Sequence, residues 1–96
     1  MVFNLIALFE IKSGHEEEMS QLLKKAAGIY KQDKHTIDWF IAQDAKEPTK
    51  FRVIERYTNQ EEGIAEHRAN PFYKEFGEKV TPWLAKPVEL LFSSEL

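Results

Sequence analysis

"TIDWFIAQDAKEPTKFRVIERY", residues 36–57, contains two strand-like segments joined by a short polar loop. Segments 36–43 and 50–57 are rich in β-branched and aromatic residues, which favour strands. The loop "DAKEPT", residues 44–49, places Pro48 among polar and charged residues and interrupts both runs. The sequence therefore predicts a β-hairpin in the middle of the chain, and the flanking segments decide which sheet it joins.

Residues 2–12, "VFNLIALFEIK", predict a first strand before the hairpin. Both alternating sets of side chains are apolar, with Asn4 among them, so we expect the strand to be covered on both faces. A helix is predicted over roughly residues 14–32, because apolar residues recur there with the 3.6-residue period. We expect Ser13 to cap this helix, with Glu16 three residues later as in a capping box.

Two helices and a last strand are predicted after the hairpin. Asn59 is a cap candidate, so a helix is expected to begin at the next residue. Asn70 and Pro71 should end that helix and start another, since Asn caps helices and Pro is preferred at the first helical position. Pro82 should close the second of these helices. Residues 87–96, "PVELLFSSEL", then predict the final strand.

The predicted order β-α-β-β-α-α-β identifies an α+β fold of the ferredoxin-like, split βαβ type. In that plan a four-stranded antiparallel sheet carries its helices on one face. The whole chain, residues 1–96, is expected to form a single domain, because the sequence shows no linker and no repeat. The second face of the sheet is also apolar, and another copy of the chain is its simplest cover. We therefore expect a homodimer that encloses a barrel-like interior, a dimeric α+β barrel.

Composition excludes several classes of function. The net charge is −3 and charges of both signs alternate along the chain, which argues against a nucleic-acid surface. The chain has no cysteine, so it has no disulfide framework and no thiolate nucleophile. Its N-terminus lacks a basic start and a cleavage-like site, and no segment is long enough to span a membrane. These features predict a soluble cytoplasmic protein without a membrane partner.

Four segments together resemble the antibiotic biosynthesis monooxygenase (ABM) family. They are "IKSGHEEEM" (11–19), "FRVIERYTNQEE" (51–62), "EHRANPFYKEF" (66–76) and "TPWLAKPVELL" (81–91). The resemblance implies a homodimer of dimeric α+β-barrel fold, with a ligand cleft between helices and sheet in each subunit. It also implies an activity, since family members oxygenate quinols or anthrone-type polyketides without metal or flavin, while others degrade haem.

The resemblance is strongest to the quinol-monooxygenase-like group, whose His-x-x-x-Pro segment is matched by His67 and Pro71. The anthrone oxygenases have an Asn, a Trp and a Tyr at the positions that the resemblance matches to Val53, Tyr57 and Gly63, so only the aromatic character of Tyr57 is kept. Haem degraders require an Asn, a Trp and a haem-ligating His. The positions that correspond to these three residues are Ala7, Glu66 and Phe76. The resemblance therefore disfavours haem as a ligand.

His67 is the candidate catalytic residue. Cofactor-free oxygenation needs an electron-rich substrate, an apolar pocket and a group that takes a proton, and an imidazole is the natural base near neutral pH. The alternative is structural, because a histidine near a helix C-terminus can bond a free carbonyl. His15 and His35 are expected to be solvated, and the three histidines are too scattered to bind a metal.

Five further residues are candidates for substrate binding. Each also has a structural interpretation, as plain core packing for the aromatic residues or as a buried amide that bonds backbone groups. The candidates are Asn4, Trp39, Tyr57, Phe72 and Phe76. Glu55 and Arg56 alternate at the end of their strand, and we expect one of them to pair across the sheet or the dimer.

The main functional hypothesis is a monooxygenase without metal, flavin or other cofactor. It would oxidise a small aromatic, quinol-like or polyketide-like substrate with O₂ in an apolar cleft. Two alternatives stay open. One is a non-catalytic dimeric domain that binds a hydrophobic metabolite, and the other is a non-oxidative cyclase or isomerase of the same fold that uses His67 as acid and base.

Overall fold

Four antiparallel strands form one sheet in the computed structural model, which describes residues 1–96. The strands are β1 (Phe3–Glu10), β2 (Thr36–Gln43), β3 (Lys50–Tyr57) and β4 (Glu89–Ser94). Their order across the sheet is β2-β3-β1-β4, so the first strand lies between the hairpin and the last strand. The hairpin predicted in the middle of the chain is confirmed, and it joins the sheet through β3.

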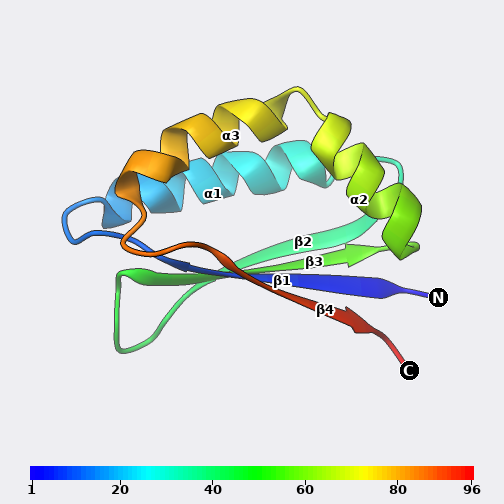
Figure 1. The fold of residues 1–96 in the computed structure, drawn as a ribbon, viewed down its shortest axis with the longest axis horizontal. Helices are drawn as coiled ribbons and strands as arrows, with labels where there is room; N and C mark the ends of the chain where they lie inside the picture. The colour runs from blue at the N-terminus through cyan, green and yellow to red at the C-terminus, as the bar shows by residue number, and fades with distance from the viewer.

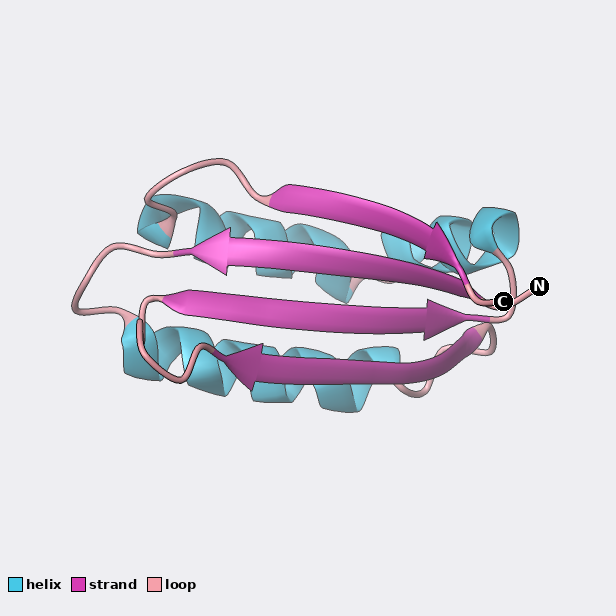
Figure 2. Cartoon of the chain, turned by 90° about the horizontal axis from the view of Figure 1, so that it is seen from below, coloured by secondary structure: helices cyan, strands magenta, loops and turns pink.

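Three helices cover one face of this sheet, as Figures 1 and 2 show from two sides. They are α1 (Glu16–Tyr30), α2 (Gln60–Ala69) and α3 (Phe72–Val80), and a short 3₁₀ turn at Thr81–Trp83 follows α3. Element order, sheet order and the one-sided layer of helices confirm the predicted ferredoxin-like α+β fold.

The core lies between the helices and the inner face of the sheet. Alternate residues of β1 point to the helices and are buried, whereas their neighbours are only half-buried. The buried face of α1 follows the predicted 3.6-residue period, and each large apolar side chain removed from water there contributes about 1.5–3 kcal/mol. The buried residues of these two elements are Phe3, Leu5, Ala7, Phe9, Met19, Leu22, Leu23, Ala26, Ala27 and Tyr30.

The first helix begins later than the sequence predicts, and the predicted cap by Ser13 is wrong. α1 starts at Glu16, its N-cap position is His15, and no side chain caps it. Gly14 has φ 102°, a left-handed conformation that glycine adopts readily, and this turn separates Ser13 from the helix. The Glu16 carboxylate instead accepts a hydrogen bond from the backbone N–H of Gly14, at 2.6 Å.

The two predicted asparagine caps are confirmed. The side-chain oxygen of Asn59 accepts from the backbone N–H of Glu62 at 2.8 Å and starts α2. The side-chain oxygen of Asn70 accepts from the backbone N–H of Phe72 at 3.0 Å, and Pro71 already has helical angles. A short junction therefore separates α2 from α3 and lets the chain change direction over the sheet.

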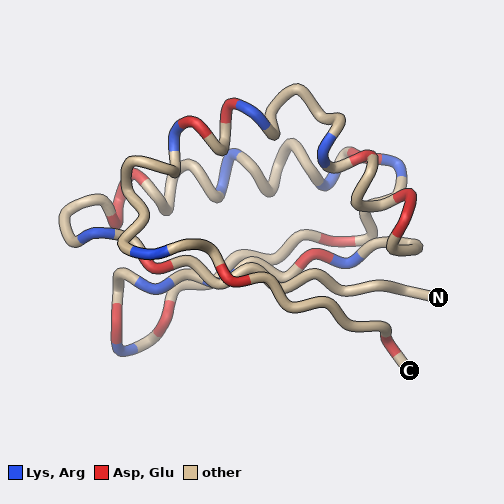
Figure 3. Tube along the Cα trace, viewed as in Figure 1, with Lys and Arg blue, Asp and Glu red and all other residues tan.

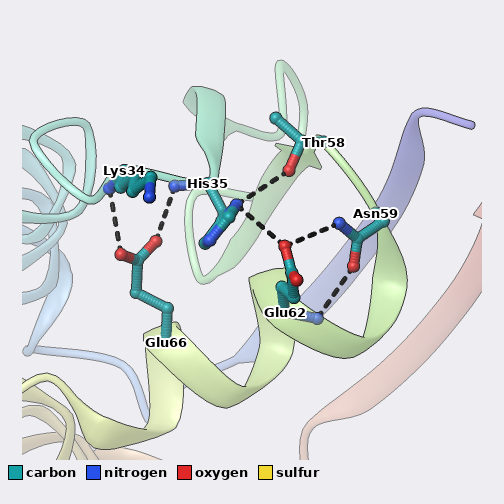
Figure 4. A network of polar contacts seen from close by, with 6 residues as sticks. All are labelled: Lys34, His35, Thr58, Asn59, Glu62 and Glu66. Carbon is teal, nitrogen blue, oxygen red and sulfur yellow. Dashed lines mark hydrogen bonds and ion pairs between the residues drawn. The ribbon is translucent and has the colours of Figure 1, made fainter.

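Polar contacts tie α2 to the start of β2 (Figure 4). The carboxylate of Glu66 accepts from the backbone N–H groups of Lys34 and His35, at 3.1 and 2.6 Å. The imidazole of His35 lies 3.1 Å from the hydroxyl of Thr58 and 3.4 Å from the carboxylate of Glu62. His35 therefore belongs to a polar network at the end of the sheet, which holds α2 in place over β3.

The outer face of the sheet carries an apolar row that crosses all four strands. The register aligns Phe40 of β2, Ile54 of β3, Ile6 of β1 and Leu91 of β4. Phe40 is 48% exposed and Leu91 is 43% exposed, because no element of this chain covers them. The apolar character predicted for both faces of the sheet is thus present, and the helices cover only one of them.

Basic and acidic positions are interspersed along the helices and strands (Figure 3). Salt bridges such as Lys25–Glu75 on the helices and Arg52–Asp44 beside the hairpin loop neutralise charges locally. Among the helices, none combines the length and the apolar character that a membrane crossing requires.

Candidate functional site

An apolar cavity of about 300 Å³ lies between the sheet and helices α2 and α3. Eleven of the 16 residues that line it are hydrophobic. The sheet contributes Leu5, Ala7 and Phe9 of β1, and α3 contributes Phe76 and Val80. The sequence builds this wall because alternate β1 residues and one face of α3 are apolar and point toward each other.

His67 lines the cavity from the last turn of α2, with only 14% of its side chain exposed. Its ring lies among tyrosines, with ring centres 4.2 Å from Tyr30 and 5.3 Å from Tyr73. Nδ1 of the imidazole is buried and has no hydrogen-bond partner. The structural interpretation of the sequence expected His67 to bond a free helix carbonyl. Nδ1 makes no such bond.

Glu55 lines the same cavity from the middle of the sheet and is only 4% exposed. The Tyr57 hydroxyl donates a hydrogen bond to Oε1 of Glu55. Nδ1 of His67 lies 3.9 Å from that same oxygen, beyond hydrogen-bond distance. A carboxyl group and an imidazole thus meet in a cavity whose lining is mostly apolar, with Arg68 and Thr81 as its other polar members.

Burial shifts both groups away from their usual titration ranges. It raises the pKa of Glu55 to about 7, although the hydrogen bond from Tyr57 favours the charged carboxylate and opposes the shift. The indole N–H of Trp39 acts in the same direction as Tyr57, while forming no regular hydrogen bond. Burial also lowers the pKa of His67 to about 4, with a smaller contribution from the positive charge of Arg68.

Burial likewise raises the pKa of two neighbouring phenols, Tyr30 and Tyr57, and the negative charge of Glu55 adds to both shifts. Both hydroxyls therefore stay protonated at neutral pH. In this pH range His67 is uncharged and Glu55 is close to its midpoint, so of these two groups Glu55 is the one that gains and loses a proton near pH 7.

Two of the predicted substrate-binding residues lie beside the cavity, behind its surface. Trp39 is buried on the inner face of the sheet opposite Glu55, and its ring packs against Tyr30 with centres 5.2 Å apart. Tyr57 is buried and contacts Glu55 through its hydroxyl. Neither side chain lines the cavity. Both affect it indirectly, because they favour the charged form of Glu55, which does line it.

The other three predicted residues lie in different places. Phe76 lines the cavity and packs edge-on against Phe9, with ring centres 6.1 Å apart. Phe72 packs against Tyr30 in the core and does not line the cavity. Asn4 lies on the outer face of the sheet, beside Arg56 in the register, and its buried Oδ1 has no partner.

Sequence reasoning did not identify Glu55 and Tyr30 as parts of the site. A signal for Glu55 is present, because it interrupts an alternating apolar set formed by Phe51, Val53 and Tyr57. The expected ion pair at the end of this strand belongs to Arg56, whose guanidinium donates to both carboxylate oxygens of Glu95, at 2.7 and 2.9 Å. Glu55 does not take part in this ion pair and is buried in the core.

The arrangement supports acid–base chemistry. Nowhere in the chain do three His, Cys, Asp or Glu side chains come together in a way that could hold a metal ion. His15 and His35, the other histidines, lie outside the cavity, where His15 contacts Glu18 at 2.8 Å and stacks on Trp83.

Three solved structures share this architecture. A Nitrosomonas europaea protein, named for antibiotic biosynthesis monooxygenase, aligns over 98% of both chains with a TM-score of 0.92 and 20% identity. Rv0793 from Mycobacterium tuberculosis aligns over 100% of this chain and 96% of its own, with a TM-score of 0.90 and 20% identity. A conserved Methanosarcina mazei protein gives a TM-score of 0.91 at 18% identity, over 100% of this chain and 94% of its own.

These likenesses establish the fold. No curated protein matches the chain in sequence. The family model described as antibiotic biosynthesis monooxygenase matches residues 2–79, which is most of the chain. The matched part includes β3, which carries Glu55, and α2, which carries His67. The chain belongs to the antibiotic biosynthesis monooxygenase (ABM) family.

Proposed function

We propose that this protein is a cofactor-independent monooxygenase that oxidises a small aromatic, quinol-like or polyketide-like substrate with O₂. The observation that carries the proposal is the apolar cavity that holds the uncharged imidazole of His67. Such a cavity excludes water from a reactive anion and offers a nitrogen that accepts a proton. The match of His67 and Pro71 to the quinol-monooxygenase-like pattern supports the same activity.

His67 acts as the base in the proposed reaction. It takes a proton from a hydroxyl or an enolisable carbon, and the resulting anion transfers one electron to O₂. The substrate radical and superoxide then combine into a peroxide. The O–O bond and the remaining C–H bond of the peroxide carbon then break, which leaves one oxygen atom on the carbon as a carbonyl. The other oxygen leaves as water with that hydrogen and the proton held by His67, so the substrate itself supplies all the electrons.

The size of the cavity restricts the substrate. A volume of about 300 Å³ is at the lower end of the range for small-molecule sites, about 300–1,000 Å³. The flat rings of Phe9, Tyr73 and Phe76 line it and suit stacking against a planar molecule. We therefore favour substrates with one or two fused rings over larger polyketides.

The protein is further proposed to act as a homodimer that packs outer sheet face against outer sheet face. Support comes from the apolar row through Phe40, Ile54, Ile6 and Leu91, exposed at Phe40 and Leu91 and half-buried between them, which a second copy would remove from water.

Oxygen uptake with one-ring hydroquinones, naphthohydroquinones and anthrones tests the activity. Wild-type protein should consume O₂ with at least one of them, and His67→Ala should lower the rate by about 10²–10⁴-fold. His15→Ala, a surface change outside the cavity, is the matched control and should retain the wild-type rate. Full activity in His67→Ala, or no uptake by wild type, would overturn the proposal.

A non-oxidative cyclase or isomerase is the second candidate. The presence of two proton-exchanging groups in one cavity favours it, because isomerisation needs a proton acceptor and a proton donor but no oxidant. Product formation in the absence of O₂ distinguishes this reaction from oxygenation. Saturable binding of an aromatic compound without turnover under either condition would instead indicate a non-catalytic binding domain.

A further inference from the structure

Glu55 is an ionisable side chain that the proposed function does not use. We propose that Glu55 is a second catalytic residue of the cavity: it shares one proton with His67, and the pair together accepts the proton that the substrate loses. The proposal rests on the proposed function for the identity of the substrate. The sharing of a proton can be tested without any substrate.

The geometry places the two groups within reach of each other. Oε1 of Glu55 and Nδ1 of His67 are 3.9 Å apart, so a movement of about 1 Å brings them to hydrogen-bond distance. Nδ1 is buried and has no other partner. The carboxylate, for its part, already accepts from the Tyr57 hydroxyl and has lone pairs left for a second donor.

The groups around the pair keep a single negative charge on it. Tyr30 from α1, Tyr57 from β3 and Tyr73 from α3 face His67, and the raised pKa values of Tyr30 and Tyr57 keep those two phenols neutral. Trp39 from β2 favours the carboxylate, and β1 and β4 contribute apolar side chains to the cavity. Arg68, which lines the cavity from the end of α2, carries a positive charge that disfavours a charged His67.

Because burial raises the pKa of Glu55 to about 7 and lowers that of His67 to about 4, the first proton that the pair takes up is held mainly by the carboxyl group and the second by the imidazole. Above pH 7 it holds a carboxylate beside a neutral imidazole and is ready to accept a proton. A neutral histidine whose pKa lies near 4 is by itself a weak base. The adjacent carboxylate strengthens it, because a negative charge at this distance stabilises the imidazolium that forms.

In the proposed step one O–H or C–H bond of the substrate breaks and its electron pair stays on the substrate as an anion. The proton binds to His67, and the new positive charge is balanced by the Glu55 carboxylate. No electron is transferred in this step. After the reaction with O₂, the pair returns the proton to the oxygen atom that leaves as water, and the starting state is restored.

A purely structural carboxyl group would not explain these features. Burying an ionisable group opposes folding unless it is paired, and a glutamine could accept the Tyr57 hydrogen bond without that penalty. Arg56, the neighbouring cation on β3, pairs with Glu95 and leaves Glu55 without a counter-ion. The chain instead keeps an uncompensated carboxyl group that faces an apolar cavity and an unpaired imidazole nitrogen.

Infrared and NMR titrations without substrate test the sharing of the proton. In wild-type protein the C=O band of a protonated carboxyl group should disappear with a midpoint near pH 7, and the ring nitrogens of His67 should shift at the same pH. Both changes should be lost in Glu55→Gln and kept in Glu61→Gln, an exposed change on the same side of the molecule. Near-ultraviolet circular dichroism checks that Glu55→Gln keeps the native packing.

Kinetics test the catalytic role. The wild-type kcat/KM should rise about tenfold per pH unit below pH 7 and then level off, whereas Glu55→Gln should lose at least about 100-fold in kcat/KM together with this pH dependence. Wild-type kinetics in Glu55→Gln, or a carboxyl band that titrates near pH 4, would overturn the inference. A shared titration near pH 7 in a protein that consumes no O₂ would instead support the pair and count against the monooxygenase activity.

Discussion

Gly63 on α2 lies directly against Tyr57 on β3. A Cβ atom built at Gly63 would be 2.5 Å from both Cβ and Cγ of Tyr57, closer than atoms of two side chains can approach. The backbone of α2 can therefore lie on the tyrosine only because residue 63 has no side chain. His67 follows four residues later on the same face of the helix, so this close approach also places its imidazole over Glu55.

We expect Gly63→Ala to lower the free energy of unfolding by about 1–3 kcal/mol, because the new methyl group must push α2 away from Tyr57. Gly28→Ala on α1 is the matched control. Its Cβ would meet no atom within 4 Å, and alanine stabilises an exposed helical position by up to about 1 kcal/mol relative to glycine. Urea unfolding of the three proteins measures both effects. A Gly63→Ala protein as stable as wild type would show that α2 moves freely.

Stability should respond to pH through Glu55. Its pKa is about 7 in the folded protein and 4.5 when unperturbed, so the folded state binds the proton more tightly. The stability this gives is fully present below pH 4.5 and is lost as pH rises through 7, a change of about 3 kcal/mol. Relative to wild type, Glu55→Gln should therefore gain about 3 kcal/mol in free energy of unfolding between pH 4.5 and 7. A constant difference across this range would contradict the buried titration.

The opposite sign is expected for His67. Its pKa is about 4 in the folded protein and 6.5 when unperturbed, so its contribution is present above pH 6.5 and is lost as pH falls through 4. Relative to wild type, His67→Gln should gain about 3 kcal/mol in free energy of unfolding as pH falls from 6.5 to 4. Denaturant unfolding at fixed pH values checks this. In wild type, as pH rises from about 4.5 to 6.5, the stability contributed by Glu55 falls while that contributed by His67 rises. The two changes largely cancel, so only the single variants reveal them.

Tyr57→Phe should raise the pKa of Glu55 above its wild-type value of about 7, because the variant removes the hydroxyl that donates to the carboxylate. Tyr73→Phe is a matched control, since Tyr73 lines the same cavity but contacts the ring of His67 and not Glu55. Infrared titration of the carboxyl band measures the pKa in each protein. An unchanged midpoint in Tyr57→Phe would show that the hydrogen bond does not stabilise the ionised form.

Ile54→Glu should convert the proposed homodimer into a monomer, because it places a charge in the centre of the apolar row on the outer sheet face. Lys24→Glu, an exposed change on α1, alters charge on the helical side and should leave the oligomeric state unchanged. Sedimentation velocity measures the mass of each protein. A wild-type monomer, or a dimer that survives Ile54→Glu, would contradict packing through this face.

The fold could be predicted because its signals are local. The hairpin around Pro48, the caps at Asn59 and Asn70 and the alternation in β1 each depend on neighbouring residues, and each agrees with the final topology. The start of α1 was predicted wrongly for an equally local reason. The left-handed turn at Gly14 competes with capping by Ser13, and sequence preferences alone did not show which would prevail.

The site was less accessible to prediction, because its members come from distant parts of the sequence. His67 could be named from its segment, but its unpaired nitrogen depends on the position of α2 over β3. Asn4 and Glu55 both interrupt apolar rows, and only the packing of the helices decides which row faces the cavity. Burial, which sets the pKa of Glu55, likewise exists only in the folded chain.

The uncompensated carboxylate beside a neutral imidazole has a consequence for the energy of the proposed proton transfer. Before the transfer the cavity contains one negative charge, on Glu55. After the transfer it contains two negative charges, on Glu55 and the substrate anion, and one positive charge on His67, so the net charge is the same. Any proton transfer inside the cavity conserves this total; what the Glu55 carboxylate adds is a counter-charge for the imidazolium that is in place before the substrate binds. The large free-energy cost of removing the Glu55 carboxylate from water arises when the protein folds, before the substrate binds.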